Sequence, residues 1–344
     1  MNKSTMVFKM RYNILMLICS VALTVFSQDL GQFDEVDSYI RQCPKYEKLE
    51  DIVKYINVNQ PSEIEKARMI YVWLAENIKY NDEGYNKSQP GSNTTNDVLK
   101  THVAVCEGYA NVFKDLGEAL GLEIVKVVGC AKGYSYEPGV YDNIEEASNH
   151  AWNAIKIDGK WMIYDATWGT GSGTTNRKGK LVSVKEFTDD WFYLDPKISI
   201  YSHFPAQSSD QYLDQPISFL RFEELPKLCP SEFKTSWLNV DEVLLMAQST
   251  KPLDFAEYYP SLKKGTIKAP ITRTIKKGKP YLFEIKSDEI TGVYLVTPDE
   301  EWIPFSLINN MFTYTLNTKN SGEYSVVIND KQKNYNALLT YQIE

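Results

Sequence analysis

The chain has 344 residues, with 37 basic and 45 acidic side chains and a net charge of −8 at pH 7. This length allows two domains and a sizeable core. An acidic balance without a basic cluster argues against nucleic acid and anionic lipid as partners. The sequence has no C-x-x-C or H-x-x-x-H pair, so we predict no structural zinc and no cofactor.

The N-terminus is typical of an export signal. Lys3, Lys9 and Arg11 precede an apolar run over residues 14–26, and Ser27 precedes a plausible cleavage point. The run is shorter than the roughly 20 residues that cross a bilayer as a helix. We therefore predict a signal peptide over residues 1–27 and a secreted, periplasmic or cell-surface protein, without stable membrane insertion after cleavage. An uncleaved membrane anchor is the alternative.

A strong helical pattern begins after Ser62. Ser62 and Glu65 match a capping box, and apolar residues then recur along one helical face. Tyr71 and Trp73 lie beside that face and are interpreted as core residues. Residues 81–96, rich in Asn, Ser, Gly and Pro, predict a loop able to flank a cleft. A short helix over residues 97–103 is expected next.

Cys106 opens the next helix. Apolar residues follow it at helical spacing, and Gly121 is the expected stop: the face consists of Tyr109, Val112, Phe113, Leu116 and Leu120. At a helix start, free N–H groups and the helix dipole favour an anion. A cysteine there has a lowered thiol pKa, and its thiolate is the reactive form. The backbone N–H of Cys106 would also be a natural oxyanion donor. A small buried core cysteine is the alternative.

A strand over residues 122–128, ended by Gly129, and then a hairpin are expected. Residues 150–157 and 160–167 flank Asp158-Gly159, a strong two-residue turn. In this register His150 and Asp165 are diagonal neighbours on one face, within reach of a hydrogen bond. An Asp that holds one imidazole nitrogen leaves the other facing a nucleophile. The hairpin thus predicts that His150 and Asp165 serve Cys106.

The remaining part of the chain changes character. Residues 226–265 contain four prolines around a short helical piece and predict a connecting segment. Over residues 266–344 short strands recur between turn residues, which predicts an all-β, immunoglobulin-like sandwich. The expected strands are 281–285, 292–296, 312–317, 322–328 and 337–343. This part offers no evident catalytic group and is interpreted as an accessory module that could bind a protein partner.

Three blocks of sequence together resemble the core of the transglutaminase-like superfamily. Two later blocks, Trp-Phe-Tyr-Leu at 191–194 and His-Phe-Pro at 203–205, resemble the branch of kyphoscoliosis peptidase and cytokinesis-type proteins. The three core blocks contain the candidate triad. They read Val-Cys-Glu-Gly-Tyr-Ala, Asn-His-Ala-Trp and Tyr-Asp-Ala-Thr-Trp and contain Cys106, His150 and Asp165. The resemblance implies an α+β, papain-like core in which a helix-borne cysteine packs on an antiparallel sheet. It places Cys106, His150 and Asp165 in the family's triad positions and makes residues 28–225 the catalytic domain, with a helical N-terminal part.

Two departures bear on the activity that this resemblance implies. Glu107 stands where animal transglutaminases have a tryptophan, which argues against protein cross-linking. The zinc-binding cysteine pairs of the family's glycanase relatives are missing, which argues against deglycosylation. The expectation is a cysteine enzyme that acts on amide bonds of proteins or peptides through a thioester, as a peptidase or an acyl transferase. The alternative is an inactive binding or scaffold protein at the cell surface.

Four other features receive non-catalytic interpretations. His102 and His203 have no carboxylate partner evident in the sequence and are assigned structural roles. Trp168 is expected to pack in the core, line the substrate groove or shield the triad from water. The glycine-rich run 169–173 lacks the ending of a phosphate-binding loop and is interpreted as a flexible loop.

Overall fold

The computed structural model describes residues 33–344, except for residues 135, 235–236, 260 and 263. The predicted signal peptide, residues 1–27, lies outside the described residues. Within the described part, no helix combines the length and the apolar character needed to pass through a bilayer.

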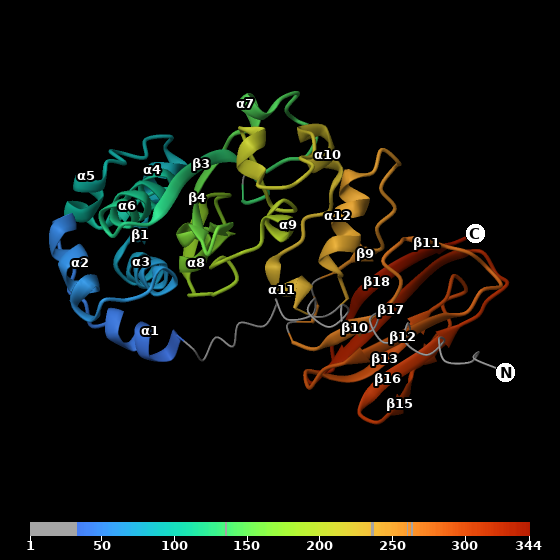
Figure 1. Ribbon diagram of the computed structural model, residues 1–344. Helices are drawn as coiled ribbons and strands as arrows, with labels where there is room; N and C mark the ends of the chain where they lie inside the picture. Colours follow the sequence, from blue (N-terminus) through green and yellow to red (C-terminus); the bar gives the residue numbers. More distant parts are fainter. Residues whose placement is uncertain (1–32, 135, 235–236, 260, 263) are drawn as a thin grey trace, which may run out of the picture.

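Helices make up the N-terminal part of the fold, drawn in blue and teal in Figure 1. The elements are α1 (Asp34–Ile40), α2 (Leu49–Ile56), the 3-10 turn η2 (Asn57–Asn59), α3 (Glu63–Asn77), β1 (Lys79–Tyr80), α4 (Asp82–Asn86), α5 (Thr95–Thr101), β2 (Val103–Ala104) and α6 (Cys106–Ala119). Helix α4 interrupts the predicted loop over 81–96. Helices α3, α5 and α6 lie where the sequence predicts helices, and β1 pairs in parallel with β2.

Helix α3 begins at the predicted capping box and buries its apolar face. The backbone N–H and the hydroxyl of Ser62 both donate to the carboxylate of Glu65, at 2.8 and 2.6 Å. These bonds stabilise the first turn. Tyr71 and Trp73 are fully buried, which confirms their interpretation as core residues. The position of α3 fixes the strand that follows it, β1, beside the start of α6.

A four-stranded antiparallel sheet supports α6. Its order is β5-β4-β3-β8, with β3 (Glu123–Ala131), β4 (His150–Ile157), β5 (Lys160–Tyr164) and β8 (His203–Pro205). The β4–β5 hairpin has the predicted register, in which Ile157 faces Lys160 and Asn153 faces Tyr164. Asp158 and Gly159 both have positive φ, as a type I′ turn requires. Helix α6 packs across β3 and β4.

The structure differs from the prediction at two strand ends. Strand β3 does not end at Gly129 but continues to Ala131, and Gly129 pairs with both His150 and Pro205. A Cβ at this position would lie 2.1 Å from the carbonyl oxygen of Phe204, so only glycine lets β8 approach. Strand β5 ends at Tyr164, and Asp165 becomes the N-cap of helix α8 (Ala166–Thr170). The expected pairs beyond Tyr164 therefore do not form.

The glycine-rich run is an ordered part of a second hairpin rather than a flexible loop. It ends α8 and begins β6 (Gly171–Thr175), which pairs with β7 (Leu181–Lys185). Helix α7 (Ile144–Ala147) lies between β3 and β4. Short elements then connect the second hairpin to the C-terminal part: α9 (Pro196–Ser199), the 3-10 turn η3 (Ser208–Gln211), α10 (Phe219–Glu224), α11 (Pro230–Phe233) and α12 (Val240–Gln248).

The C-terminal part consists of two β-sheets, largely antiparallel, as the recurring strands predict. One sheet has the order β10-β12-β16-β15 and the other β11-β18-β17-β13-β14, with β9 added on β18 and β11 parallel to it. The strands are β9 (Glu257–Tyr258), β10 (Thr266–Lys268), β11 (Thr274–Ile275), β12 (Tyr281–Lys286), β13 (Ile290–Val296), β14 (Trp302–Pro304), β15 (Ser306–Ile308), β16 (Met311–Leu316), β17 (Gly322–Asp330) and β18 (Tyr335–Ile343).

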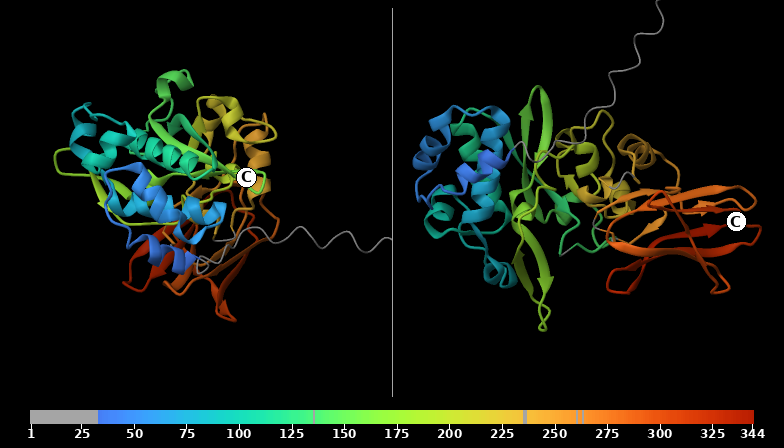
Figure 2. Two further views of the ribbon diagram at one scale, coloured as in Figure 1. Left: turned by 60° about the vertical axis from the view of Figure 1, so that its left-hand side comes forward. Right: turned by 90° about the horizontal axis from the view of Figure 1, so that it is seen from below.

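One hydrophobic core joins the central sheet to the C-terminal sheets. It includes Phe204 of β8 and Phe222 of α10, continues through Trp237 and Val243, and reaches Phe283 of β12. Residues of the expected connecting segment are thus buried between two parts of the fold. In Figure 2 the view from below shows helices, central sheet and C-terminal sheets following one another.

Candidate active site

Cys106 is the first residue of α6, as the sequence predicts. Val105 is the N-cap, so the thiol lies beside the free N–H groups of the first turn. Burial raises the pKa of the Cys106 thiol, but the charge and hydrogen bond of His150 and a hydrogen bond from the backbone of Ala151 outweigh it. The net result is a lowered pKa. The residue as a whole is partly exposed.

His150 and Asp165 form the predicted pair. The Nε2 atom of His150 lies 2.7 Å from Oδ2 of Asp165, and both side chains are nearly excluded from solvent, at 8% and 1% exposed. Burial lowers the pKa of His150, but the Asp165 carboxylate and the Cys106 thiolate raise it to about 10 overall. Since Nε2 is engaged with the carboxylate, Nδ1 remains for the thiol. The imidazole is therefore poised as a charged partner of the thiolate.

Asp165 reaches this position by a different route from the predicted one. Instead of extending β5, it caps α8, and its Oδ1 accepts the backbone N–H of Trp168 at 3.0 Å. Burial raises the pKa of the carboxyl, but the two histidines lower it to well below its ordinary range. The same carboxylate thus caps helix α8 and binds the imidazoles. The hydrogen-bond donors on its two oxygens keep it ionised.

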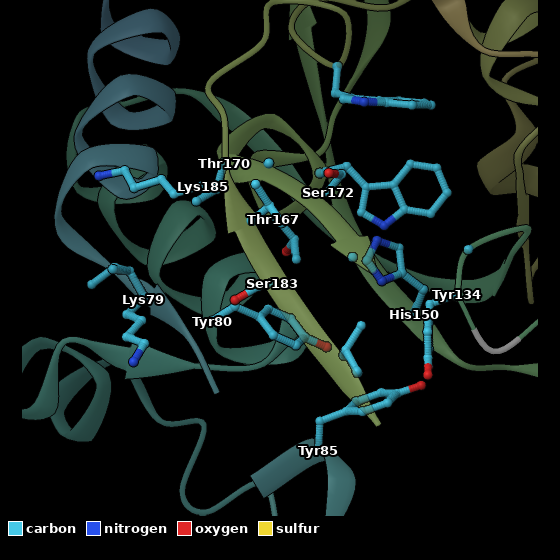
Figure 3. Close-up of a pocket in the computed structure, with 18 of the residues that line it drawn as sticks. Lys79, Tyr80, Tyr85, Tyr134, His150, Thr167, Thr170, Ser172, Ser183 and Lys185 are labelled. Carbon is cyan, nitrogen blue, oxygen red and sulfur yellow. The ribbon is translucent and has the colours of Figure 1, made fainter. Parts of the chain in front are cut away.

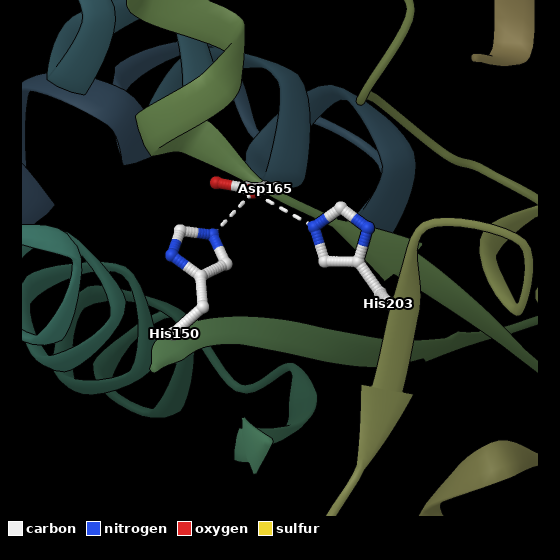
Figure 4. Close-up of side chains that lie close together, drawn as sticks. All are labelled: His150, Asp165 and His203. Atoms are coloured by element: carbon white, nitrogen blue, oxygen red, sulfur yellow. Dashed lines mark hydrogen bonds and ion pairs between the residues drawn. The ribbon is translucent and has the colours of Figure 1, made fainter. Parts of the chain in front are cut away.

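No carboxylate partner for His203 is evident in the sequence, and the structure shows that Asp165 is that partner. Its Nε2 lies 3.1 Å from the same Oδ2 of Asp165, and its Nδ1 lies 2.9 Å from the Ser202 hydroxyl. Burial lowers the pKa of His203, so the ring is neutral near pH 7. We assign its single proton to Nε2, because that nitrogen faces the carboxylate. Figure 4 shows Asp165 between the two imidazoles.

Tryptophans enclose the histidines. Trp168 lies over both rings, with centroid distances of 5.4 Å to His150 and 4.4 Å to His203. Trp152 and Trp191 pack on the remaining sides, at 5.0 and 5.2 Å from the His203 ring. Two of the expected roles of Trp168, shielding the triad and lining the groove, are combined here. The low-polarity surroundings strengthen the interactions of the charged pair.

A cavity of about 690 Å³ lies beside this group, as Figure 3 shows. Its walls come from the end of α3, from β1, from α8 and from the β6–β7 hairpin. Its lining includes His150, Trp168 and Trp191 and the tyrosines Tyr80, Tyr85 and Tyr134. The hydroxyl of Tyr80 is directed into the cavity. The volume is in the range of sites that bind small molecules or short peptide segments.

The other cysteines differ sharply from Cys106. Cys43, Cys130 and Cys229 are free, and burial raises the pKa of each thiol to about 11. His102 also lies away from the site. It ends α5 in a left-handed conformation with φ of 54°, in keeping with its assigned structural role.

Three of the site residues also have the composition of a metal site. The ligand atoms of His150, Asp165 and His203 lie within 4.8 Å of one another. In this structure the carboxylate already accepts hydrogen bonds from both rings, and the second nitrogen of each ring has its own partner. Hydrogen bonding thus accounts for the cluster, and the absence of a metal stays a prediction.

The fold and the site define a class of protein in which a helix-borne thiol meets an imidazole and a carboxylate on a sheet. The comparison with known families agrees with this class. Residues 50–166 match the model described as "Transglutaminase-like superfamily", and this part of the chain belongs to that superfamily. The matched range contains Cys106, His150 and Asp165.

The chain matches only part of the length of each relative. The chain is similar to kyphoscoliosis peptidase of Homo sapiens, 29% identical over 202 residues, which are 59% of this chain and 30% of that protein. Cytokinesis protein 3 of Saccharomyces cerevisiae is 26% identical over 173 residues, 50% of this chain and 19% of that protein. A solved structure described as a TGase is 21% identical, covers 46% of this chain and 37% of its own, and gives a TM-score of 0.28.

Proposed function

We propose that the protein is an exported cysteine enzyme that acts on amide bonds of proteins or peptides through a thioester. The observation that supports this most is the contact of the Cys106 thiol with His150, whose other nitrogen is 2.7 Å from Asp165. Cysteine, histidine and aspartate in this order form a nucleophile, its base and the group that orients the base.

In the proposed reaction His150 transfers a proton in each of two stages, the formation and the release of a thioester. His150 takes the thiol proton, and the thiolate attacks the amide carbonyl carbon. The tetrahedral intermediate collapses as the C–N bond breaks, and the amine leaves with the proton from His150. The acyl group remains on sulfur as a thioester. Water then releases it in a peptidase, or a second amine does so in a transferase. His150 takes the proton of the incoming nucleophile and returns it to the thiolate.

Two groups are placed to stabilise the oxyanion. The backbone N–H of Cys106 lies at the free end of α6, where the helix dipole favours negative charge. Tyr80 is the candidate for the second donor, because its hydroxyl points into the cavity. Burial, with a smaller contribution from Cys106, raises the pKa of Tyr80 well above its ordinary range. The hydroxyl therefore stays protonated and can donate a hydrogen bond to the oxyanion.

The open cavity favours an enzyme over an inactive scaffold. A scaffold that only retained the fold would not need a cavity beside the imidazole, yet His150 lines one, and its partner Cys106 is partly exposed as a residue. The name of the human relative, kyphoscoliosis peptidase, supports hydrolysis. Glu107 points the same way. Its carboxylate is exposed beside Lys126, at 3.3 Å, at the position where animal transglutaminases have a tryptophan.

The remaining features of the proposal concern location and the C-terminal part. We interpret residues 1–27 as a signal peptide, and the protein as secreted, periplasmic or surface-bound. The two C-terminal sheets are interpreted as an immunoglobulin-like accessory module that could hold a protein partner. The exposed strand β15 at the edge of one sheet offers such a surface.

Site-specific alkylation tests the nucleophile directly. Iodoacetamide at pH 6 should modify Cys106 quickly and leave Cys43, Cys130 and Cys229 unmodified, because among these four described cysteines only the Cys106 thiol has a lowered pKa. Peptide mass spectrometry locates the label. Cys106→Ala should remove it.

The control for alkylation is Cys229→Ala, which should leave the labelling rate unchanged. A Cys106 thiol that titrates near the free-cysteine value of about 8.5 would contradict the activated nucleophile. The activity itself is then assayed by mass change in a peptide library, with and without an added amine. Loss of amine from the peptides with gain of water indicates a peptidase, and incorporation of the added amine indicates a transferase.

A further inference from the structure

We propose that the cavity lined by His150 selects acidic peptide segments, in which Asp or Glu residues flank the amide bond under attack. This inference rests on the proposed function, whose substrate class it specifies. It comes from the charges that line the cavity and from the way these charges are paired.

Four lysines line the cavity, and all four are exposed. Lys45 comes from the segment between α1 and α2, Lys79 from β1, Lys185 from the end of β7 and Lys227 from the segment after α10. Among the described residues that line the cavity, Glu76 supplies the one carboxylate. Elements far apart in sequence thus contribute cationic groups to one site.

The charge of Glu76 is already compensated. Lys185 Nζ lies 3.1 Å from its Oε2, and Arg41 Nε lies 3.4 Å from its Oε1. Within the described part of the chain, Lys45, Lys79 and Lys227 have no carboxylate partner within the 4.0 Å of an ion pair. Three ammonium groups around the cavity therefore remain available to a ligand.

This local excess is opposite to the charge of the whole protein. The chain has a net charge of −8, yet the cavity has four cationic side chains and one anionic. A cleft of one sign with aromatic walls of low polarity focuses the field and raises the local concentration of oppositely charged ligands. The acidic remainder of the surface does not favour such ligands, so the cavity is where an acidic segment binds.

The lysines come from separate elements around the cavity. In Figure 3 Lys79 and Lys185 lie together on one side of Tyr80, and His150 lies on the other. Lys227 lines the cavity together with Trp191, which packs 5.2 Å from the His203 ring. We infer that a segment bound past His150 meets ammonium groups from more than one element of the cavity wall. Carboxylates that flank the bond match this distribution.

Peptide mixtures test the preference. Three mixtures share the same central residues and differ in their flanks, which contain Asp, Ser or Lys. Each is offered to the wild type for kcat/KM and to Cys106→Ala for the binding constant. We expect the order Asp, Ser, Lys in both measurements, with a preference that weakens as salt rises.

A triple variant and its matched control assign the preference to the cavity. Lys45→Gln, Lys79→Gln and Lys227→Gln together should reduce the Asp-over-Ser ratio, by up to about fivefold for each lysine. The control removes the same charge from exposed lysines of the C-terminal sheets: Lys279→Gln, Lys286→Gln and Lys319→Gln. It should keep the wild-type ratio.

The outcomes separate this inference from the proposed function. Equal binding of the three mixtures, including no binding of any, overturns the inference, as does a triple variant that keeps the wild-type ratio. If Cys106 still reacts fast at pH 6 and Ser-flanked peptides are turned over, the proposed function stands without it. If Cys106→Ala binds Asp-flanked peptides selectively while the wild type turns over no mixture, the selectivity stands and the proposed function fails.

Discussion

Replacing His203 tests whether a second imidazole positions the first through their common carboxylate. Asp165 accepts three hydrogen bonds in the structure, from Trp168, His150 and His203. His203→Leu removes the third and leaves a packed apolar side chain in its place. A hydrogen bond to a charged group contributes about 1.5–3 kcal/mol. If all of it is lost in the transition state, kcat falls by about tenfold to 150-fold.

The same loss should change the acid stability of the protein. The depressed pKa of folded Asp165 contributes stability that is present above its unfolded pKa and lost as pH falls through the folded pKa. Without the His203 donor the folded pKa moves up by about 1–2 units, by the equivalence of 1.36 kcal/mol and one pKa unit. Acid unfolding of His203→Leu should therefore begin at higher pH than in the wild type.

Three measurements separate positioning from packing. Tryptophan fluorescence follows acid unfolding, because Trp168 and Trp191 lie against the His203 ring. Steady-state kinetics should show a lower kcat with KM little changed, since His203 does not line the cavity. His203→Gln keeps an amide donor and should recover part of both losses. If His203→Leu has the acid midpoint and kcat of the wild type, or Gln restores neither, His203 does not position Asp165.

Three further perturbations address the site and its support. His150→Gln should raise the pKa of the Cys106 thiol above the free value, because burial and the Asp165 charge then outweigh the remaining hydrogen bond from the Ala151 backbone. Iodoacetamide labelling followed from pH 5 to 10 would then show no acidic inflection, and a retained inflection contradicts the ion pair. Tyr80→Phe should lower kcat by about 100-fold if it donates to the oxyanion, and an unchanged kcat would exclude that role. Gly129→Ala should destabilise the fold by about 1–3 kcal/mol in urea unfolding, because its Cβ would meet the carbonyl of Phe204; an unaltered midpoint would contradict this close approach.

Sequence patterns predicted the elements that local rules control. The spacing after Cys106 and the Asp158-Gly159 turn depend on residues near one another in the chain, so helix α6 and the hairpin register follow from them. The contact of His150 with Asp165 was predicted for the right pair through the wrong geometry. A capping aspartate ends β5 one residue after Tyr164, and alternation along a strand does not show where a cap takes over.

The role of His203 could not be obtained from local patterns. Its strand β8 is three residues long and reaches the site by pairing with β3, which lies more than seventy residues earlier in the chain. The signal that was available was Gly129, a glycine directly after a β-branched run and followed by the small residues Cys130 and Ala131. Such a glycine often marks the close approach of another backbone, and here that backbone is β8.

The shared core of the central sheet and the C-terminal sheets has a practical consequence for anyone who shortens this protein. Cutting the chain near residue 265 would strip cover from Phe204 and Phe222, which belong to the same buried cluster as Phe283. Phe204 lies next to His203, so solvent admitted there would reach the strand that holds the second imidazole. A minimal catalytic fragment should therefore extend to Glu344. Replacing the C-terminal sheets by another module would require redesign of the aromatic side chains that pack against them, Phe204 and Phe222.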